Sequence, residues 1–401
     1  MTHRSAIYDA LIIGGGPAGA TAALMLARAG CSVAVVEKKA FPRRKVCGEF
    51  ISATSRPLLQ ELGLCDRYDA LAGPHVRRVG LYAGETVLDA PMPQPSGAAA
   101  LWGRAIGREH FDTMLLDAAV EAGAVLWQPW TATALRRVGH GYSCRVARRH
   151  DERTLDARIV IAANGSWERG PLVVETSPAH RPSDLIGFKA HFIGGRSPAD
   201  LMPLLVFPGG YGGMVHSDGR RVSLSCCVRR DALEASRQRY AGASAGDAVL
   251  RHIKDSCRGV REALDGTETE GPALSAGPIR PGIRARYSEG IFYVGNAAGE
   301  AHPIVAEGIS MAMQSGWLLC RRLIARRDSL ASPRLLADIG RAYAADWDES
   351  FAPRLRAAAL FAAIASRPSA AALAVELLRR FPAILTFGAQ LSGKTRHVVA
   401  A

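Results

Sequence analysis

Three glycines near the start of the chain have the spacing of a loop that binds phosphate groups. The loop reads Gly14-x-Gly16-x-x-Gly19, follows an apolar stretch, residues 7–13, and opens a run of strong helix formers, residues 20–29. Glycines in this pattern allow a tight turn, admit a pyrophosphate to the backbone and let the helix pack closely on the strand. The position of the loop between a predicted strand and a predicted helix makes it a candidate dinucleotide site.

An acidic residue follows the loop at the distance that a nucleotide-binding unit requires. Glu37 ends the second predicted strand, residues 32–37, about 20 residues after the glycines, where a carboxylate binds the adenosine ribose. The helix that begins near Pro17 and Ala18 is predicted to direct its free amides and its positive end at the phosphates. The first 37 residues therefore read as a strand–helix–strand unit.

A second glycine-rich segment lies about 280 residues further along the chain. The run Gly295-Asn296-Ala297-Ala298-Gly299 follows a short predicted strand, residues 290–294, and leads through His302 into a long predicted helix. Small residues permit the close approach of a ligand, and the N-terminus of a helix favours negative charge. A nicotinamide dehydrogenase needs no second site of this kind.

The second segment resembles the G-D-A-A-G motif of FAD-dependent flavoproteins related to aromatic hydroxylases, flavin halogenases and geranylgeranyl reductases. Four further stretches resemble motifs of the same superfamily: residues 41–49, residues 107–116 around Arg108, Asn164-Gly165-Ser166, and residues 208–212. The similarity extends from about residue 7 to residue 327. It implies an FAD-dependent oxidoreductase with NAD(P)H as the electron donor.

The resemblance also implies roles for individual residues. In the family, the residue matched by Arg108 faces the FAD pyrophosphate, and the residue matched by Cys47 lies near the flavin and the substrate. Motif and resemblance together predict the following cofactor-binding residues: Gly14, Gly16, Pro17, Ala18, Gly19, Glu37, Lys38, Arg44, Cys47, Arg108, Asn164, Gly165, Gly295, Asn296, Glu307, Gly308 and Ile309. A helix N-terminus beside the flavin is expected to stabilise its reduced form by about 0.3 to 2 kcal/mol.

Three positions depart from the family pattern. Asn296 and Asn164 each stand where the family usually has an aspartate, which removes negative charge beside the expected cofactor. Ala306 replaces the usual glycine two residues before Gly308 and adds a methyl group near the expected flavin. We expect these changes to affect how tightly FAD is retained.

Four side chains are candidate catalytic residues, and each has a structural alternative. Cys47 either acts beside the flavin or is inert packing. Glu49 is either a desolvated general acid or base or a solvated loop acid. His302 either relays a proton or is structural, and Tyr211 either points into the substrate cavity or packs within a sheet.

Three functions agree with these residues. The one that the sequence favours is an NAD(P)H-driven monooxygenase that hydroxylates an apolar, aromatic or polyketide-like small molecule through a flavin hydroperoxide. The second is a flavin reductase of carbon–carbon double bonds, similar to geranylgeranyl reductases, and the third is a non-catalytic electron carrier. Halogenation is disfavoured, because the W-x-W-x-I-P signature that resembles a flavin halogenase's is absent between residues 184 and 228.

The order of the elements predicts an α/β fold. It has a doubly wound Rossmann-like FAD-binding domain, an inserted antiparallel-sheet substrate domain and a helical C-terminal region. The predicted boundaries are 1–75, 104–180 and 276–330 for the FAD-binding domain, 76–103 and 181–275 for the substrate domain, and 331–401 for the C-terminal region. Helices are predicted over 104–122, 231–240 and 246–257, and the C-terminal helices are predicted to break at Pro333, Pro353, Pro368 and Pro382.

Composition excludes several other classes. The chain has 401 residues and a net charge of +13, and because only six of its 50 basic residues are lysines, 44 are arginines. No basic run reaches five residues, so no nucleic-acid partner is expected, and the eight scattered cysteines predict neither a disulfide framework nor a metal site. No apolar run approaches the roughly 20 residues of a membrane span, so a cytoplasmic location is expected. The oligomeric state stays open.

The C-terminal helices combine arginine with alanine and leucine. Arg354, Arg356, Arg379 and Arg380 occur within these otherwise apolar stretches. This basic amphipathic character agrees with three roles. The helices contact a membrane or lipid at its surface, they cover a lipophilic substrate, or they pack on the flavin domain.

Overall fold

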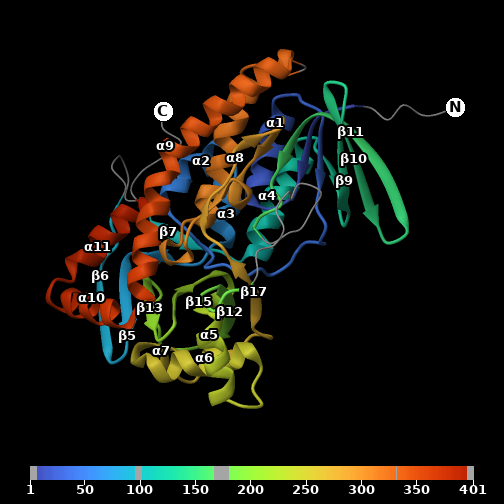
Figure 1. The fold of residues 1–401 in the computed structure, drawn as a ribbon. Helices are drawn as coiled ribbons and strands as arrows, with labels where there is room; N and C mark the ends of the chain where they lie inside the picture. The colour runs from blue at the N-terminus through green and yellow to red at the C-terminus, as the bar shows by residue number, and fades with distance from the viewer. Residues whose placement is uncertain (1–6, 95–101, 167–179, 331, 395–401) are drawn as a thin grey trace.

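The computed structural model describes residues 7–94, 102–166, 180–330 and 332–394 (Figure 1). Two large sheets occupy the upper and lower parts of the molecule in this view. The long helix α9 (Pro333–Ala365) runs beside both of them. The residues expected to do chemistry lie where the two layers meet.

The upper sheet has a parallel core with the strand order β20-β11-β1-β2-β8. Its strands are β1 (Tyr8–Ile13), β2 (Val33–Val36), β8 (Val125–Trp127), β11 (Asp151–Ala162) and β20 (Ile291–Tyr293), with β19 (Tyr287–Ser288) as an antiparallel edge. Ala10 and Ile12 belong to the apolar core on one face of this sheet, whereas Leu11 and Ile13 belong to the core on the other. Burial on both faces explains the continuous apolar runs of these strands.

The two faces of the upper sheet are covered differently. Helices α1 (Pro17–Arg28), α4 (Arg108–Glu121) and α8 (Gly308–Ile324) cover one face. An antiparallel meander of β9 (Thr131–Val138), β10 (Gly141–Arg148) and β11 covers the other. The expected Rossmann-like FAD-binding fold is confirmed, with a meander in place of helices on its second face.

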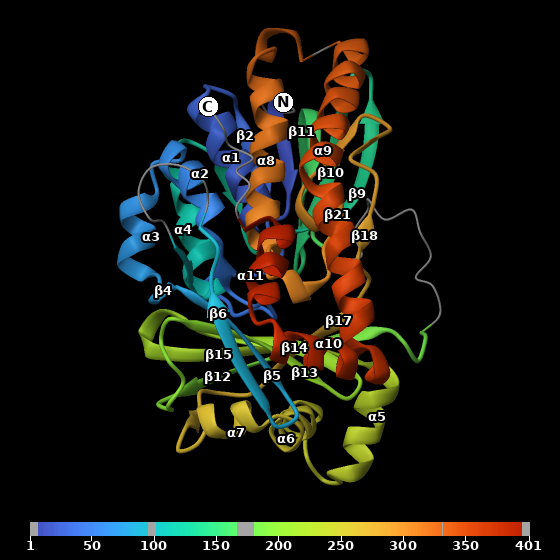
Figure 2. The same ribbon diagram turned by 90° about the vertical axis from the view of Figure 1, so that its left-hand side faces the viewer.

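The lower sheet has the strand order β16-β12-β15-β14-β13-β5-β6, and β17 also pairs with β12. Its strands are β5 (Arg78–Ala83), β6 (Thr86–Pro91), β12 (Leu185–Ile193), β13 (Leu201–Phe207), β14 (Gly210–His216), β15 (Arg221–Arg229), β16 (Glu268–Thr269) and β17 (Leu274–Ile279). All pairings are antiparallel except that of β13 with β5. Figure 2 shows α5 (Arg230–Arg239), α6 (Ala245–Ser256) and α7 (Arg258–Ala263) below this sheet.

Short elements connect the two layers. A small sheet contains β3 (Phe50–Ile51), β7 (Gly103–Ala105) and β4 (His75–Val76), and a second one pairs β18 (Gly282–Ile283) with β21 (Gly299–Glu300). Helices α2 (Arg56–Glu61) and α3 (Cys65–Leu71) follow β3. The six-segment division of the chain stays a prediction.

Two expectations about helices are wrong. The helix expected from residue 104 begins at Arg108, because residues 103–105 pair with β3 and β4 and Gly107 is still extended, with ψ 138°. Pro353 does not break the C-terminal helix but lies inside α9. Its missing N–H removes one helical hydrogen bond, while Phe351 and Leu355 are buried on either side and hold the helix in place by packing.

Helices α1 and α8 approach each other closely enough for their backbones to touch. A Cβ atom added to Gly316 in α8 would lie 2.7 Å from the carbonyl oxygen of Ala18 in α1. The alanine-rich sequence of α1 has short side chains along this contact, so α8 can approach its backbone. The segment that precedes α8 is thereby brought beside the N-terminus of α1.

The C-terminal helices extend from the upper layer to the lower sheet. After α9 come α10 (Pro368–Arg380) and α11 (Ala383–Ala389), of which α11 packs Leu385 and Ala389 into the apolar core of β5 and β6. Within the described part of the chain, no helix alone has the length and apolar composition to cross a membrane, although α9 and α10, bent by 103°, meet both criteria as a pair.

The contact between α1 and α8 generates the first prediction. We expect Gly316→Ala to lower the free energy of unfolding by about 1 to 3 kcal/mol, because the added methyl meets backbone that cannot move independently. The matched control is Gly388→Ala in α11, where an added Cβ has no neighbour within 4 Å and alanine is favoured over glycine by up to about 1 kcal/mol. Urea unfolding measures both, and a Gly316→Ala protein as stable as the Gly388→Ala protein would contradict the close contact.

Candidate functional site

The first glycine loop leaves backbone open where a ligand would bind. A Cβ on Gly14 would lie 2.4 Å from the carbonyl oxygen of Ala163, and one on Gly19 would lie 1.9 Å from the carbonyl oxygen of Gly14. These two glycines are therefore required for the turn itself. A Cβ on Gly16 would meet only Lys45 Nζ, 4.0 Å away, so this face of the loop, which leads to Pro17 and Ala18 in the first turn of α1, is accessible.

Glu37 is held at the end of β2 beside this loop. The side chain is buried, and its carboxylate accepts hydrogen bonds from the backbone N–H groups of Gly15 and Lys39, both at 2.9 Å. Two donors fix the direction of the carboxylate. Lys38 is half-buried next to it.

A cationic cluster lies beside Gly16. Asp112 on α4 pairs with Lys45 Nζ at 2.7 Å and with Arg108 Nε at 2.6 Å. Burial alone would raise the pKa of Asp112, but the two cations outweigh it and hold the pKa below its usual range. Two cations against one anion leave a net positive charge next to the open backbone, which suits a pyrophosphate. Arg108 also contacts the Cys47 thiol.

The second glycine segment meets the first through close contacts. Gly295 has φ +61°, and a Cβ added to it would lie 2.9 Å from Cβ of Ala18. Its N–H donates a hydrogen bond of 2.7 Å to Ser315 Oγ on α8. Only a glycine fits this position without strain, so the two segments predicted to share the cofactor lie side by side.

Asn296 joins the second segment to the turn at Asn164-Gly165-Ser166. Its Nδ2 donates to Ser166 Oγ at 2.9 Å and to Glu300 Oε1 at 3.3 Å. Glu300 is buried, and burial raises the pKa of its carboxyl group. An aspartate at 296 would place a second carboxylate against Glu300, whereas an amide can donate. The departure at Asn296 therefore has a partner, and Gly165 next to it has φ +79°.

The N-terminus of α8 is the third wall of the site. Glu307 precedes the helix and is fully buried, and its carboxylate accepts from Ser52 Oγ at 3.2 Å and pairs with Lys394 Nζ at 3.0 Å. Protein groups therefore satisfy this residue, which was predicted to bind the cofactor. Gly308 is exposed with no neighbour within 4 Å of an added Cβ, whereas Ile309 is buried.

Ala306 adopts the left-handed conformation, with φ +52° and ψ 38°. Alanine pays a steric cost there that glycine does not. The backbone geometry therefore accounts for the glycine that the family usually has at this position.

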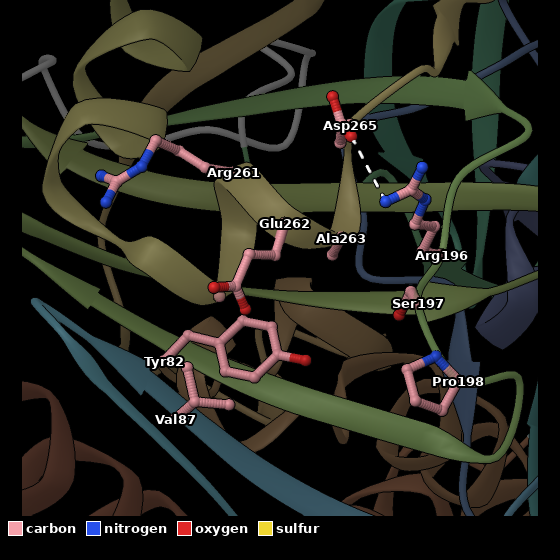
Figure 3. A pocket seen from close by; sticks show the side chains of 10 residues that line it. Tyr82, Val87, Arg196, Ser197, Pro198, Arg261, Glu262, Ala263 and Asp265 are labelled. Carbon is pink, nitrogen blue, oxygen red and sulfur yellow. Dashed lines mark ion pairs between the residues drawn. The ribbon is translucent and has the colours of Figure 1, made fainter.

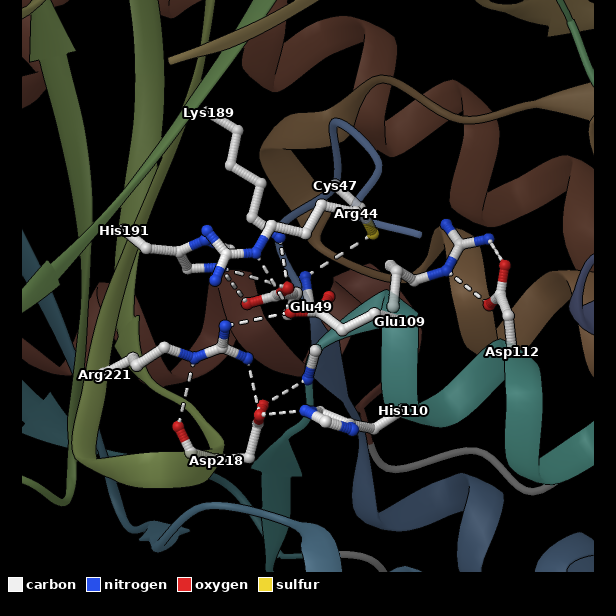
Figure 4. A network of polar contacts seen from close by, with 12 residues as sticks. Arg44, Cys47, Glu49, Glu109, His110, Asp112, Lys189, His191, Asp218 and Arg221 are labelled. Atoms are coloured by element: carbon white, nitrogen blue, oxygen red, sulfur yellow. Dashed lines mark hydrogen bonds and ion pairs between the residues drawn. The ribbon is translucent and has the colours of Figure 1, made fainter. Parts of the chain in front are cut away.

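A buried ionic cluster surrounds Glu49, as Figure 4 shows. Its carboxylate contacts Lys189 Nζ and lies 3.2 Å from His191 Nε2, and all three side chains are almost completely buried. Burial would raise the pKa of Glu49, but the hydrogen bond from His191 and the charge of Lys189 together lower it. Glu49 is therefore an ionised, buried residue at neutral pH, so the solvated alternative does not apply and the carboxyl group holds no proton to donate.

The backbone at Glu49 is also unusual. The residue has φ +62°, and its N–H donates to Cys47 Sγ at 3.5 Å. Non-glycine residues in this region cost about 1 to 3 kcal/mol and persist only where the surroundings hold them. The cluster with Lys189 and His191 supplies that restraint, so it fixes the turn that carries Cys47.

The sequence reasoning missed Lys189 and His191, although a signal for them exists. Along β12, Phe188, Ala190 and Phe192 belong to the apolar core that α6 and α7 cover. In a strand, alternate residues point to opposite faces, so Lys189 and His191 point toward the upper layer. Polar residues at alternate positions of an otherwise apolar strand therefore indicate the face of the sheet that points toward the site.

A second group of ion pairs continues along the same boundary. Arg44 Nε lies 3.4 Å from Glu109 Oε1, and Arg44 Nη2 lies 3.0 Å from Glu270 Oε2. Arg221 pairs with Glu109 at 2.9 Å and with Asp218 at 2.5 Å. Arg44 thus ties the loop after β2 to acids of α4 and the lower layer, and its role toward the cofactor stays a prediction.

Tyr211 and His302 come together although 91 residues separate them. Tyr211 Oη on β14 lies 3.3 Å from His302 Nδ1. Burial raises the pKa of the Tyr211 hydroxyl and lowers the pKa of His302. At neutral pH the phenol is therefore protonated and the imidazole neutral, so the pair is an uncharged contact. Tyr211 is 1% exposed and packs in an apolar cluster with residues of α9.

The molecule also has a cavity away from these residues. It measures about 470 Å³ and is lined by residues that include Tyr82, Arg196 and Glu262 (Figure 3). It lies at the outer side of the lower sheet, beside α7, and neither glycine segment reaches it. We therefore do not assign the cofactor to this cavity.

The open backbone at Gly16 beside a cationic cluster has the chemistry of a site for a dinucleotide cofactor. Residues 7–343 match the family described as FAD binding domain. The chain belongs to this family of FAD-dependent oxidoreductases.

Known proteins similar to this chain include reductases and halogenases. The chain is 26% identical over 367 residues to digeranylgeranylglycerophospholipid reductase 1 of Methanopyrus kandleri, covering 86% of this chain and 87% of that one. It is 28% identical over 353 residues to menaquinone reductase of Mycobacterium tuberculosis, covering 82% and 80%. The structure of a flavin-dependent brominase matches 97% of this chain and 94% of that one with a TM-score of 0.75 at 18% identity, a likeness of fold alone.

The cationic cluster generates a prediction about cofactor affinity. We expect Lys45→Met to weaken FAD binding by about tenfold to a hundredfold, since hydrogen bonds to charged groups contribute about 1.5 to 3 kcal/mol. Lys254→Met, on α6 over the Phe192 ring, is the matched control. Titration of the apoprotein followed by flavin fluorescence measures both, and equal affinities would remove Lys45 from the cofactor site.

The Glu49 cluster generates a prediction about stability and pH. Because the pKa of Glu49 is below its ordinary value of 4.5, its ion pairs stabilise the fold above pH 4.5, and this stabilisation is lost as the pH falls below that value. We expect Glu49→Gln to cost about 3 kcal/mol near pH 7, as for one partner of a buried ion pair, and to cost less toward about pH 4.

The matched control for this variant is Glu121→Gln. Like Glu49, Glu121 pairs with a basic residue; its partner is Arg67, at 2.7 Å, but both side chains are exposed. We therefore expect little change in the free energy of unfolding at any pH. Urea unfolding across the pH range measures both variants. A Glu49→Gln effect that grows as the pH falls would contradict the ionised assignment.

Proposed function

We propose that the protein is an FAD-dependent reductase that adds hydrogen to a carbon–carbon double bond of an apolar, prenyl-like substrate, with NAD(P)H as the electron donor. The observation that carries the proposal is the Cys47-Gly48-Glu49 turn, which Lys189 and His191 of the lower sheet hold against the cofactor domain. Both relatives described above are named reductases and match more than three quarters of the chain. Their names support placing reduction ahead of hydroxylation, the order opposite to that favoured by the sequence alone.

The residues present fit the cofactor. Gly16 and Gly308 would leave backbone free for it, Glu37 would take the adenosine ribose, and Lys45 and Arg108 would face the pyrophosphate. FAD, when bound, supplies two-electron chemistry that links a nicotinamide to the substrate double bond. The chain's own task is to bind, to orient and to manage protons.

The proton of the proposed reaction is assigned to a single group. Reduction of a double bond needs one proton in addition to a hydride, and we assign it to the Cys47 thiol, which Glu49 N–H holds in the turn. Glu49 does not donate, because it is ionised; it is a positioning residue. Tyr211, hydrogen-bonded to His302, is a neutral wall that orients an apolar chain and excludes water.

Hydroxylation is the second candidate. The desolvation that raises the pKa of Tyr211 and lowers that of His302 makes a dry wall, which oxygen-transferring sites also require to prevent side reactions. The third candidate, an electron carrier, needs only the cofactor site.

One experiment separates the three reactions. The purified protein with FAD is incubated with NAD(P)H and either menaquinone or a geranylgeranyl lipid, with and without oxygen, and products are analysed by mass. We expect a gain of two hydrogens without oxygen. A product heavier by one oxygen atom would assign hydroxylation, and reduction of a protein acceptor without any small-molecule product would assign the carrier.

The role of Cys47 has its own test. We expect Cys47→Ser to lower the rate of product formation by about 10²- to 10⁴-fold, the usual contribution of a positioned acid, while the reduction of bound FAD by NAD(P)H stays unchanged. Cys65→Ser on α3, also half-buried and free, is the matched control. A full rate in Cys47→Ser would remove the thiol from proton transfer.

A further inference from the structure

The end of the chain carries an unusual concentration of exposed apolar side chains. Among the described residues, seven of the 15 exposed large hydrophobic side chains lie between residues 360 and 391. They are Leu360, Leu373, Leu377, Phe381, Ile384, Phe387 and Leu391, with 37% to 73% of each side chain exposed. Both exposed phenylalanines of the described chain are among them. Scattered single residues of this kind are ordinary, but a concentration of them marks an interaction surface.

Helix α11 is apolar on both of its sides. Leu385 and Ala389 are buried against the lower sheet, while Ile384 and Phe387 are exposed, as is Leu391 just beyond the helix. The stretch from Phe381 to Leu391 contains no charged residue. A helix that is apolar all round belongs in a protein core or in lipid, and only one side of α11 has a protein core against it.

Helix α10 presents a similar face. Leu373 and Leu377 are four residues apart, so they lie on the same side of the helix, and no residue of α10 is buried. Figure 2 shows α10 and α11 next to each other at the end of the long helix α9, beside β5 and β6. The two helices therefore lie as a layer on the molecule whose outer side lacks a protein partner within the described chain.

The exposed charge at this face is mainly positive. Residues 351–394 contain six basic residues and one acid, Glu376, and two of the six, Arg354 and Lys394, are buried. Glu376 already pairs with Arg379 at 3.1 Å and with Arg380 at 3.1 Å. Arg356 and Arg367 are exposed as well. An apolar face with arginines beside it matches the acyl and headgroup zones of an anionic lipid layer.

We infer that α10 and α11 form a docking face for the surface of an anionic lipid bilayer, into which Leu373, Phe381 and Phe387 insert. A second copy of the chain fits this face less well, because a symmetric contact would bring the same excess of arginines together. The inference does not depend on which reaction the flavin performs. Lipid docking would place the lower layer and the N-terminus of α8 close to a source of apolar substrate, since Lys394 joins the end of this region to Glu307.

Vesicle sedimentation of the FAD-loaded protein tests the inference. We expect binding to phosphatidylcholine vesicles that contain phosphatidylglycerol to be about tenfold tighter than to phosphatidylcholine alone, and to weaken as salt is added. The variant Leu373→Glu/Phe381→Glu/Phe387→Glu should lose binding by about tenfold or more. A second variant, Arg379→Gln/Arg380→Gln, should lose the preference for anionic vesicles.

The matched control is Val120→Glu/Val138→Glu/Ile193→Glu, which changes three exposed apolar residues on other elements. This control should bind vesicles as the unchanged protein does, and flavin absorbance and thermal unfolding show that each variant is folded. Failure of the unchanged protein to sediment, or equal binding by both triple variants, overturns the inference. Self-association without lipid that the first variant abolishes would assign the face to a second copy instead. Because sedimentation needs no turnover, its outcome is independent of the proposed reaction.

Discussion

The contact between α1 and α8 is the constraint on which the cofactor site depends. Gly19 lets α1 lie against the turn at Gly14, Gly316 lets α8 lie against the backbone of α1, and Gly295 passes beside Ala18. Each of these approaches leaves too little room for a methyl group, so no residue with a side chain can replace the glycine without moving a helix. Both glycine segments, about 280 residues apart in the chain, reach the same edge of the upper sheet only because the two helices pack at this distance.

A second constraint acts at the boundary between the layers, which is built from charges. Glu49 has two cationic or hydrogen-bonding partners, Asp112 has two cations, and Arg221 has two buried acids. Buried ion pairs return little net stability, because desolvation offsets their attraction. They do penalise misalignment, since a small shift leaves a buried charge without its partner. The boundary therefore acts mainly to set how the lower sheet faces the cofactor domain and where the turn at Cys47 lies.

The sequence predicts those features that depend on neighbouring residues and misses those that depend on contacts between distant parts of the chain. The glycine loop, Glu37 and the second segment are local patterns, and the sequence placed each of them on the element where the structure has it. The resemblance assigned both Asn296 and the turn at Asn164-Gly165-Ser166 to the cofactor site, and Ser166 does contact Asn296. The roles of Lys189 and His191 were not predicted, because their partner Glu49 is about 140 residues away in the chain and no local spacing connects them. The ion pairs of Arg44 could not be predicted for the same reason, because the acids that hold it belong to α4 and to the lower layer.

The places of the charged residues in the structure help to explain the net charge of +13. At the boundary between the layers, arginines such as Arg221 stand opposite acids, so they add little to the external field. In residues 351–394 the excess arises mainly because acids are scarce, with one glutamate against six basic residues. Two of these basic residues, Arg354 and Lys394, are buried, and Lys394 pairs with Glu307. The other four, Arg356, Arg367, Arg379 and Arg380, are exposed near the apolar side chains of α9, α10 and α11. Like charges repel one another in water, so the fold itself gains nothing from exposed arginines gathered beside leucine and phenylalanine. The anionic lipid surface that we propose would give this excess a partner.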